Sequence, residues 1–162
     1  MHEKGSAVRN DEAEELRRPT RAQALRRLAA LYRQADAAYA RFSCPASAEC
    51  CQLRRRGRQP WLWPVESAAL EDALRRQGRR VPEPRADGGC PLLDEAGRRC
   101  TVYEDRPFGC RTYFCDRASG GRHPLEATNA LAARLEALAA EADPAAAAAG
   151  PRPILEWLEA AR

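Results

Sequence analysis

Residues 90–115 read CPLLDEAGRRCTVYEDRPFGCRTYFC, and this stretch contains four of the seven cysteines in a chain of 162 residues. DEAG predicts a turn, CTVY predicts a short β-prone segment, and Pro107 fits the first position of a brief helix that contains Cys110. These cysteines lie among prolines, glycines and arginines and not at the spacing of a helical core, so burial as small apolar side chains explains them poorly. The stretch therefore predicts an irregular fold organised around thiols.

The other three cysteines lie in residues 44–51, which read CPASAECC. No CxxC pair occurs in the chain, which disfavours a simple zinc finger. A single site must therefore join this segment to residues 90–115, and metal binding should be part of folding. Four converging thiolates suit zinc, copper(I) or an iron–sulfur cluster.

The adjacent cysteines Cys50 and Cys51 have side chains that point in different directions. We expect either that one of them binds the metal while the other supports it, or that the pair bridges two metals. A disulfide between them would strain the peptide that joins them.

Charge and the ends of the chain favour a reduced, soluble protein. The first ten residues, MHEKGSAVRN, contain no apolar run of a secretory signal, and no stretch approaches the ~20 apolar residues of a membrane helix. The net charge of +4 is small beside 27 basic and 23 acidic side chains that are interleaved along the sequence. We therefore expect a cytoplasmic protein with reduced thiols, no membrane contact and no nucleic-acid partner.

The rest of the sequence predicts helices that pack around the cysteine cluster. Thr20 and Gln23 form a capping-box signature, and an apolar stripe follows at Leu25, Leu28, Tyr32, Ala35, Tyr39 and Phe42. The run RRRGR at 54–58 predicts an exposed loop. Two further helices are predicted, one over VESAALEDALRRQ ending at Gly78, and one over residues 124–144 with core positions Leu125, Leu131, Leu135 and Leu138.

The fold class that we predict is a mainly α, small, irregular, metal-stapled domain with little β structure. Residues 1–19 are expected to be a flexible leader and residues 20–142 the cysteine-cluster metal-binding domain. Residues 143–150 are expected to be an Ala-rich linker, and residues 151–162 a C-terminal docking helix.

The two cysteine segments together resemble a known family. CPASAECC, a helical segment and then CPLLDEAGRRCTVYEDRPFGCRTY are similar to the YkgJ-type cysteine-cluster proteins, described as zinc- or iron-chelating domains or iron–sulfur cluster-containing proteins. The resemblance covers about residues 42–115. It implies metal ligands among Cys44, Cys50, Cys51, Cys90, Cys100 and Cys110. Ser47 stands where the second cysteine of the fuller pattern would be, and Cys115 could supply a substitute.

The resemblance also suggests a role for the basic residues beside Cys110. Four thiolates on a zinc ion or on an oxidised cubane leave a net negative charge, and Arg106 and Arg111 would compensate that charge and hydrogen-bond to sulfur, with Tyr103 nearby. The alternative is that Arg106 forms only a surface ion pair with Glu104 or Asp105.

Three functions remain open at this level. The leading one is a metal-binding protein that holds an iron–sulfur cluster, or an iron or zinc ion, with a redox role as one option. The second is a thiol–disulfide switch that uses Cys110 and Cys115 or another pair. The third is a structural zinc module that presents its arginine-rich surface to nucleic acid or to a protein. No catalytic constellation is present, so enzymatic activity, the protein or redox partner and the oligomeric state stay open.

Overall fold

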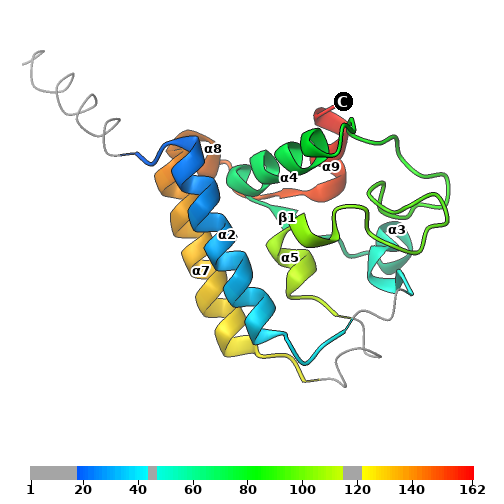
Figure 1. Cartoon of the computed structure of the whole chain (residues 1–162), viewed down its shortest axis with the longest axis horizontal. Helices are drawn as coiled ribbons and strands as arrows, with labels where there is room; N and C mark the ends of the chain where they lie inside the picture. Colours follow the sequence, from blue (N-terminus) through cyan, green and yellow to red (C-terminus); the bar gives the residue numbers. More distant parts are fainter. Residues whose placement is uncertain (1–17, 44–46, 115–121) are drawn as a thin grey trace, which may run out of the picture.

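Two long helices, α2 (Arg21–Ala38) and α7 (Leu125–Ala142), lie side by side and run in opposite directions in the computed structural model (Figure 1). The structure describes residues 18–43, 47–114 and 122–162. A third helix, α4 (Pro64–Arg76), contacts both long helices. The remaining described elements are short: η1 (Glu49–Cys51), α3 (Leu53–Arg56), β1 (Trp61–Leu62), η2 (Tyr103–Asp105), α5 (Phe108–Arg111), α8 (Pro144–Ala148), β2 (Arg152–Pro153) and α9 (Ile154–Ala160). The predicted fold class, mainly helical with little β structure, is confirmed.

Helix α2 begins where the capping box predicts. The Thr20 hydroxyl accepts from the Gln23 backbone, and the Gln23 side chain accepts from the Thr20 backbone. The helix ends at Ala38, before the last two apolar positions of the predicted stripe. Tyr39 and Phe42 are nevertheless buried, because they pack with Phe114 in a separate aromatic cluster.

Helix α7 supplies the other half of the first core. Leu131, Leu135 and Leu138 are buried against α2, whereas Leu125 is 67% exposed and its predicted core role is wrong. Leu125 lies six residues before Leu131, and this spacing places it on a different face of a helix with 3.6 residues per turn.

Helix α4 has well-defined ends. Pro64 occupies its first turn, and the Glu66 carboxylate accepts from the Trp63 backbone N–H at 3.1 Å. At the other end Gly78 has φ +65°, and the Arg79 N–H donates to the Leu74 carbonyl at 2.9 Å. Glycine tolerates this left-handed conformation, which explains why the helix stops there.

A second core gathers around the C-terminal segment. β1 and β2 pair as an antiparallel ribbon, with Leu62 opposite Arg152. Ile154, Trp157 and Leu158 of α9 are buried in one cluster with Leu62 and residues of α4 and of the cysteine-rich stretch. Within the range predicted as a linker, residues 144–148 form the short helix α8, and the Asp143 carboxylate caps it by accepting from the Ala146 N–H.

Two further local predictions differ from the structure. The RRRGR run is exposed, as expected, but its three leading arginines belong to helix α3, which the left-handed Gly57 ends, and not to a loop. CTVY was expected to be a β-prone segment, but only Cys100 forms a single bridge, with Leu93, and the chain then turns into η2. Two backbone hydrogen bonds make that bridge, from the Thr101 N–H to the Leu92 carbonyl and from the Asp94 N–H to the Arg99 carbonyl, and the Thr101 hydroxyl also donates to Leu92. In the described parts of the chain, none of the helices has the length and apolar character that crossing a membrane requires.

Candidate metal centre

Five cysteines line one cavity of 1310 Å³ between the two halves of the cysteine-rich sequence: Cys50, Cys51, Cys90, Cys100 and Cys110. They come from η1, from the start of residues 90–115, from the Leu93 bridge and from α5. Cys44 and Cys115 lie outside the described residues. The tertiary structure thus brings all five described thiols to a common space, as a shared site requires.

The two cysteine segments are joined through their backbones. The Cys90 N–H donates to the Cys51 carbonyl at 2.7 Å, which fixes the start of the second segment against the end of the first. The turn before η1 depends on Ala48, a buried residue with φ +51°. That left-handed conformation is uncommon for a residue other than glycine, and it turns the chain so that Cys50 and Cys51 reach the cavity.

The adjacent thiols differ in acidity. The Sγ atoms of Cys50 and Cys51 are 3.8 Å apart. The hydrogen bond from Cys51 lowers the pKa of Cys50 to about 7, whereas donation of that hydrogen bond and burial raise the pKa of Cys51. Cys50 therefore has substantial thiolate character at neutral pH, and thiolate is the form that binds metals.

The deeper thiols stay protonated in the absence of a cation. Burial raises the pKa of Cys90 to about 12, with Cys100 and Cys50 adding to the effect. Burial also raises the pKa of Cys110, and the nearby thiol groups of Cys90 and Cys100 raise it further. These thiols are thus near enough to influence one another, and a bound cation would favour their ionisation.

The donor chemistry fits a soft metal, but the described thiols do not close around a point. In the described ranges, no three side chains of His, Cys, Asp or Glu are grouped so that they could hold a metal ion. His123 lies instead against the aromatic cluster, with its ring stacked on Phe42 at a centroid distance of 5.7 Å. The five thiols are therefore arranged around a cavity and not around a preformed ion site.

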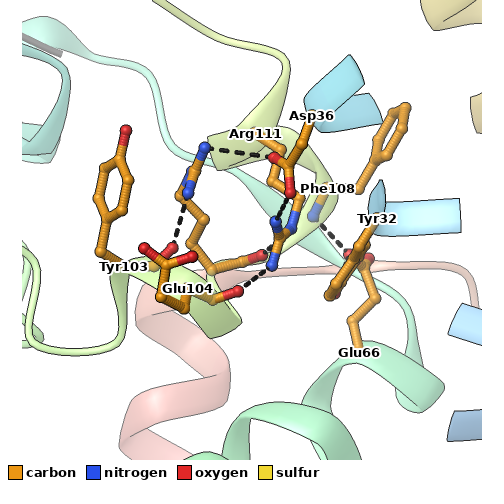
Figure 2. Close-up of polar contacts among 8 residues, drawn as sticks. Tyr32, Asp36, Glu66, Tyr103, Glu104, Phe108 and Arg111 are labelled. Carbon is orange, nitrogen blue, oxygen red and sulfur yellow. Dashed lines mark hydrogen bonds and ion pairs between the residues drawn. The ribbon is translucent and has the colours of Figure 1, made fainter. Parts of the chain in front are cut away.

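The arginines beside Cys110 form a polar network with helix α2 (Figure 2). Arg111 is buried, and one of its N–H groups donates to the Asp36 carboxylate at 2.5 Å. Arg106 reaches the other oxygen of Asp36 at 3.4 Å. The Arg111 Nε–H donates to the Arg106 carbonyl at 2.7 Å, and Nη2 donates to the Glu104 carbonyl. Compensation of thiolate charge by these arginines stays a prediction, because their recorded hydrogen bonds end on carboxylate and carbonyl oxygens.

Two aromatic rings complete the setting of these arginines. The guanidinium of Arg111 lies 4.1 Å from the ring centroid of Tyr32, and that of Arg106 lies 3.9 Å from the centroid of Tyr103. Such stacking favours arginine over lysine. Of the two acidic partners considered for Arg106, Asp105 pairs with Arg76 at 2.7 Å. The ion pair that Arg106 forms is the one with Asp36.

Glu66 and Asp36 are the site residues that sequence reasoning missed. Glu66 is 1% exposed and lines the cavity, and its carboxylate accepts from Tyr32, Trp63 and the Phe108 backbone. Its place two residues after Pro64 is the local signal that could have marked it as a capping residue of α4. Burial raises the pKa of Glu66, although its hydrogen bonds and Arg111 oppose the shift. Only the tertiary structure shows that Glu66 also accepts the Phe108 N–H at the start of α5.

A comparison with protein-family models matches residues 43–130, which is more than half of the chain, to CxxCxxCC, "Putative zinc- or iron-chelating domain". The matched range includes all seven cysteines. Neither the curated proteins nor the solved structures give a match. The CxxCxxCC spacing fits Cys44, Cys50 and Cys51, with Ser47 in place of the second cysteine. Because this match covers most of the chain and contains the thiols of the cavity, the chain belongs to the CxxCxxCC family of zinc- or iron-chelating domains.

Proposed function

We infer that this chain binds an iron–sulfur cluster through cysteine thiolates, in preference to a single zinc or iron ion. The observation that carries this inference is the convergence of five thiols from separate segments on one cavity. The family description, which names zinc or iron, supports metal binding in general. A cluster reaches across a wider gap than a single ion, which suits thiols that surround a space without closing on a point.

The ligands that we propose come from both cysteine segments. They are Cys44, one member of the Cys50–Cys51 pair, Cys90, Cys100 and Cys110, with Cys115 and the other member of the pair in reserve. When bound, an iron–sulfur cluster supplies one-electron transfer, whose partner would be a redox protein. The described thiols share their cavity with the apolar side chains of Leu92, Val102 and Phe108. A cytoplasmic location would keep unliganded thiols reduced.

The first test is the composition of the protein purified without oxygen. Iron, zinc and acid-labile sulfide are measured per chain together with the visible absorption spectrum. Iron and sulfide in matching amounts with a broad visible band are expected. Zinc alone, without colour, would contradict the cluster and leave a closed structural ion site.

Cysteine variants identify the ligands. Cys110→Ser and Cys100→Ser are expected to lose most of the bound metal and much of the stability, because a missing thiolate opens the site and binding is coupled to folding. Cys115→Ser is the matched control and should have a milder effect. Full metal content and unchanged solubility of the Cys100 and Cys110 variants would show that the ligand assignment is wrong.

A thiol–disulfide switch is the second candidate, and the pKa of about 7 for Cys50 favours it. Such a thiolate reacts readily with oxidants and alkylating agents. Mass spectrometry after mild oxidation of the metal-free chain would locate the disulfide. Alkylation of both Cys50 and Cys51 that is as fast in the metal-loaded protein as in the metal-free protein would favour the switch, because a member of the pair that binds metal is protected.

A further inference from the structure

Helix α5 consists of the four residues Phe108–Arg111 and carries one of the proposed ligands, Cys110. A single helical turn has almost no stability of its own in water. Its position must therefore come from contacts with the rest of the protein. The residue before it, Pro107, cannot cap it with a side-chain hydrogen bond, so its first N–H needs a partner from elsewhere.

Three of the four residues of α5 are held by neighbouring elements. The Phe108 N–H donates to Oε1 of Glu66 at 2.7 Å. Gly109 lies against the segment before β1, where an added Cβ would come within 2.9 Å of the Pro60 Cβ. Arg111 is fixed by Asp36 and by backbone carbonyls. Cys110 is the remaining residue of this turn, and it lines the cavity.

Glu66 is the point at which three helices meet. Oε1 accepts from the Tyr32 hydroxyl of α2 at 3.0 Å as well as from the Phe108 N–H of α5 (Figure 2). Oε2 accepts from the Trp63 N–H at the start of α4. Burying a carboxylate is costly unless hydrogen bonds satisfy it. A cap for α4 alone would not need such burial, because a helix end at the surface can be capped in water.

We propose that Glu66 is a positioning residue that holds α5 so that the Cys110 thiol faces the metal site. The proposal rests on the metal-binding function proposed above. Glu66 does not bind the metal in this account. It acts through the Phe108 N–H, at a distance of two residues along the helix from the ligand. Residues that orient metal ligands in this way typically contribute 10- to 100-fold to metal affinity.

The test is Glu66→Gln in the full chain, with Co²⁺ as the probe. The dissociation constant is measured by competition with a chelator without oxygen, and the ligand-field absorption bands report the coordination geometry. Glutamine has one neutral carbonyl oxygen in place of two charged ones, so the Phe108 N–H, the Tyr32 hydroxyl and the Trp63 N–H can no longer all donate to it, and the bond to Phe108 loses its charge assistance. We expect Co²⁺ affinity to fall by about 10- to 100-fold and the bands to shift.

Two control variants separate positioning from loss of stability. Asp72→Asn makes the same chemical change on α4, but at an ion pair with Arg21 that has no contact with α5. It should leave affinity and bands unchanged. Leu138→Ala lowers stability through the α2–α7 core and leaves every recorded contact of Glu66 intact. It should lower the melting temperature without shifting the bands. If Glu66→Gln does not fold, Glu66→Asp keeps the charge, shortens the reach, and should lower affinity in the same direction.

Two results would overturn the proposal while the metal-binding function stands. One is a Glu66→Gln protein with wild-type Co²⁺ affinity and bands. The other is a Leu138→Ala protein that loses affinity and shifts its bands as much as Glu66→Gln does. A wild-type chain that holds no iron or zinc and binds no Co²⁺ would instead overturn the proposed function itself, and the role of Glu66 with it.

Discussion

At the residue scale, the most consequential polar contact is the ion pair between Asp36 and Arg111. The Arg111 side chain is 3% exposed, whereas that of Asp36 is 42% exposed. The Arg111 guanidinium is therefore shielded from water, whereas the Asp36 carboxylate is still partly solvated. A buried cation depends strongly on its partners, because water cannot replace them. Tyr32 and the backbone carbonyls of Glu104 and Arg106 share this task, which makes Arg111 the anchor between α2 and α5.

Asp36→Asn is expected to destabilise the protein by about 1.5–3 kcal/mol, because the change removes the charged acceptor of a buried arginine. Chemical denaturation of the metal-loaded protein measures the free energy of unfolding. Asp72→Asn is the matched control, since its arginine partners are exposed, and it should cost no more than about 1 kcal/mol. Equal losses in the two variants would mean that the buried network adds nothing beyond a surface ion pair.

At the element scale, the short helix α9 closes the second core. Its N-terminus is tied to the segment before β1 by the Ile154 N–H, which donates to the Pro60 carbonyl at 2.9 Å. Trp157 is 6% exposed and packs in the cluster that also includes Cys90 and, at its edge, Cys51 and Cys100. Helix α9 therefore packs against the core residues that support three cysteines of the cavity, Cys51, Cys90 and Cys100.

Trp157→Ala is expected to cost about 3–5 kcal/mol, the usual range for removing a buried aromatic side chain. Bound metal should fall as well, because the cysteines share that core. Thermal unfolding and metal analysis of the same sample measure both effects. Leu155→Ala, at a partly buried position of the same helix, should be clearly milder. A Trp157→Ala protein with normal stability would contradict the assignment of α9 to the core.

At the scale of the whole molecule, protons link metal binding to folding. Without metal, a raised pKa for Cys90 means that the folded chain keeps a proton that the unfolded chain releases near its ordinary value of 9.0. That contribution to stability is complete below pH 9, and it is lost as the pH rises towards about 12. With metal, the thiols must ionise, so acid and not alkali should weaken the complex.

Opposite pH dependences are therefore expected for the two forms. The metal-free protein should lose stability above about pH 9, and the metal-loaded protein should lose affinity on acidification, by about tenfold per pH unit for each proton released. Thermal unfolding across pH measures the first effect, and chelator competition at several pH values measures the second. Metal affinity that does not change with pH would exclude protonated thiols as the ligands.

The sequence by itself determined the long helices and the ligand chemistry of the site. Local rules suffice for the capping box at Thr20, the left-handed stop at Gly78 and the apolar stripes of α2 and α7, because these depend on residues within a few positions of one another. The thiol pattern likewise indicated metal chelation, since ligand chemistry belongs to the side chains themselves.

Only the tertiary structure decided how these parts meet. The pairing of β1 with β2, the burial of Glu66, the Asp36–Arg111 pair and the backbone bond between Cys51 and Cys90 all join residues that are far apart in the chain. No local pattern encodes such contacts, because each exists only when the helices have packed and water has left the interface. The sequence supplied the thiols, and packing between distant segments decided which of the described ones share a cavity and that the Glu66 carboxylate lines it.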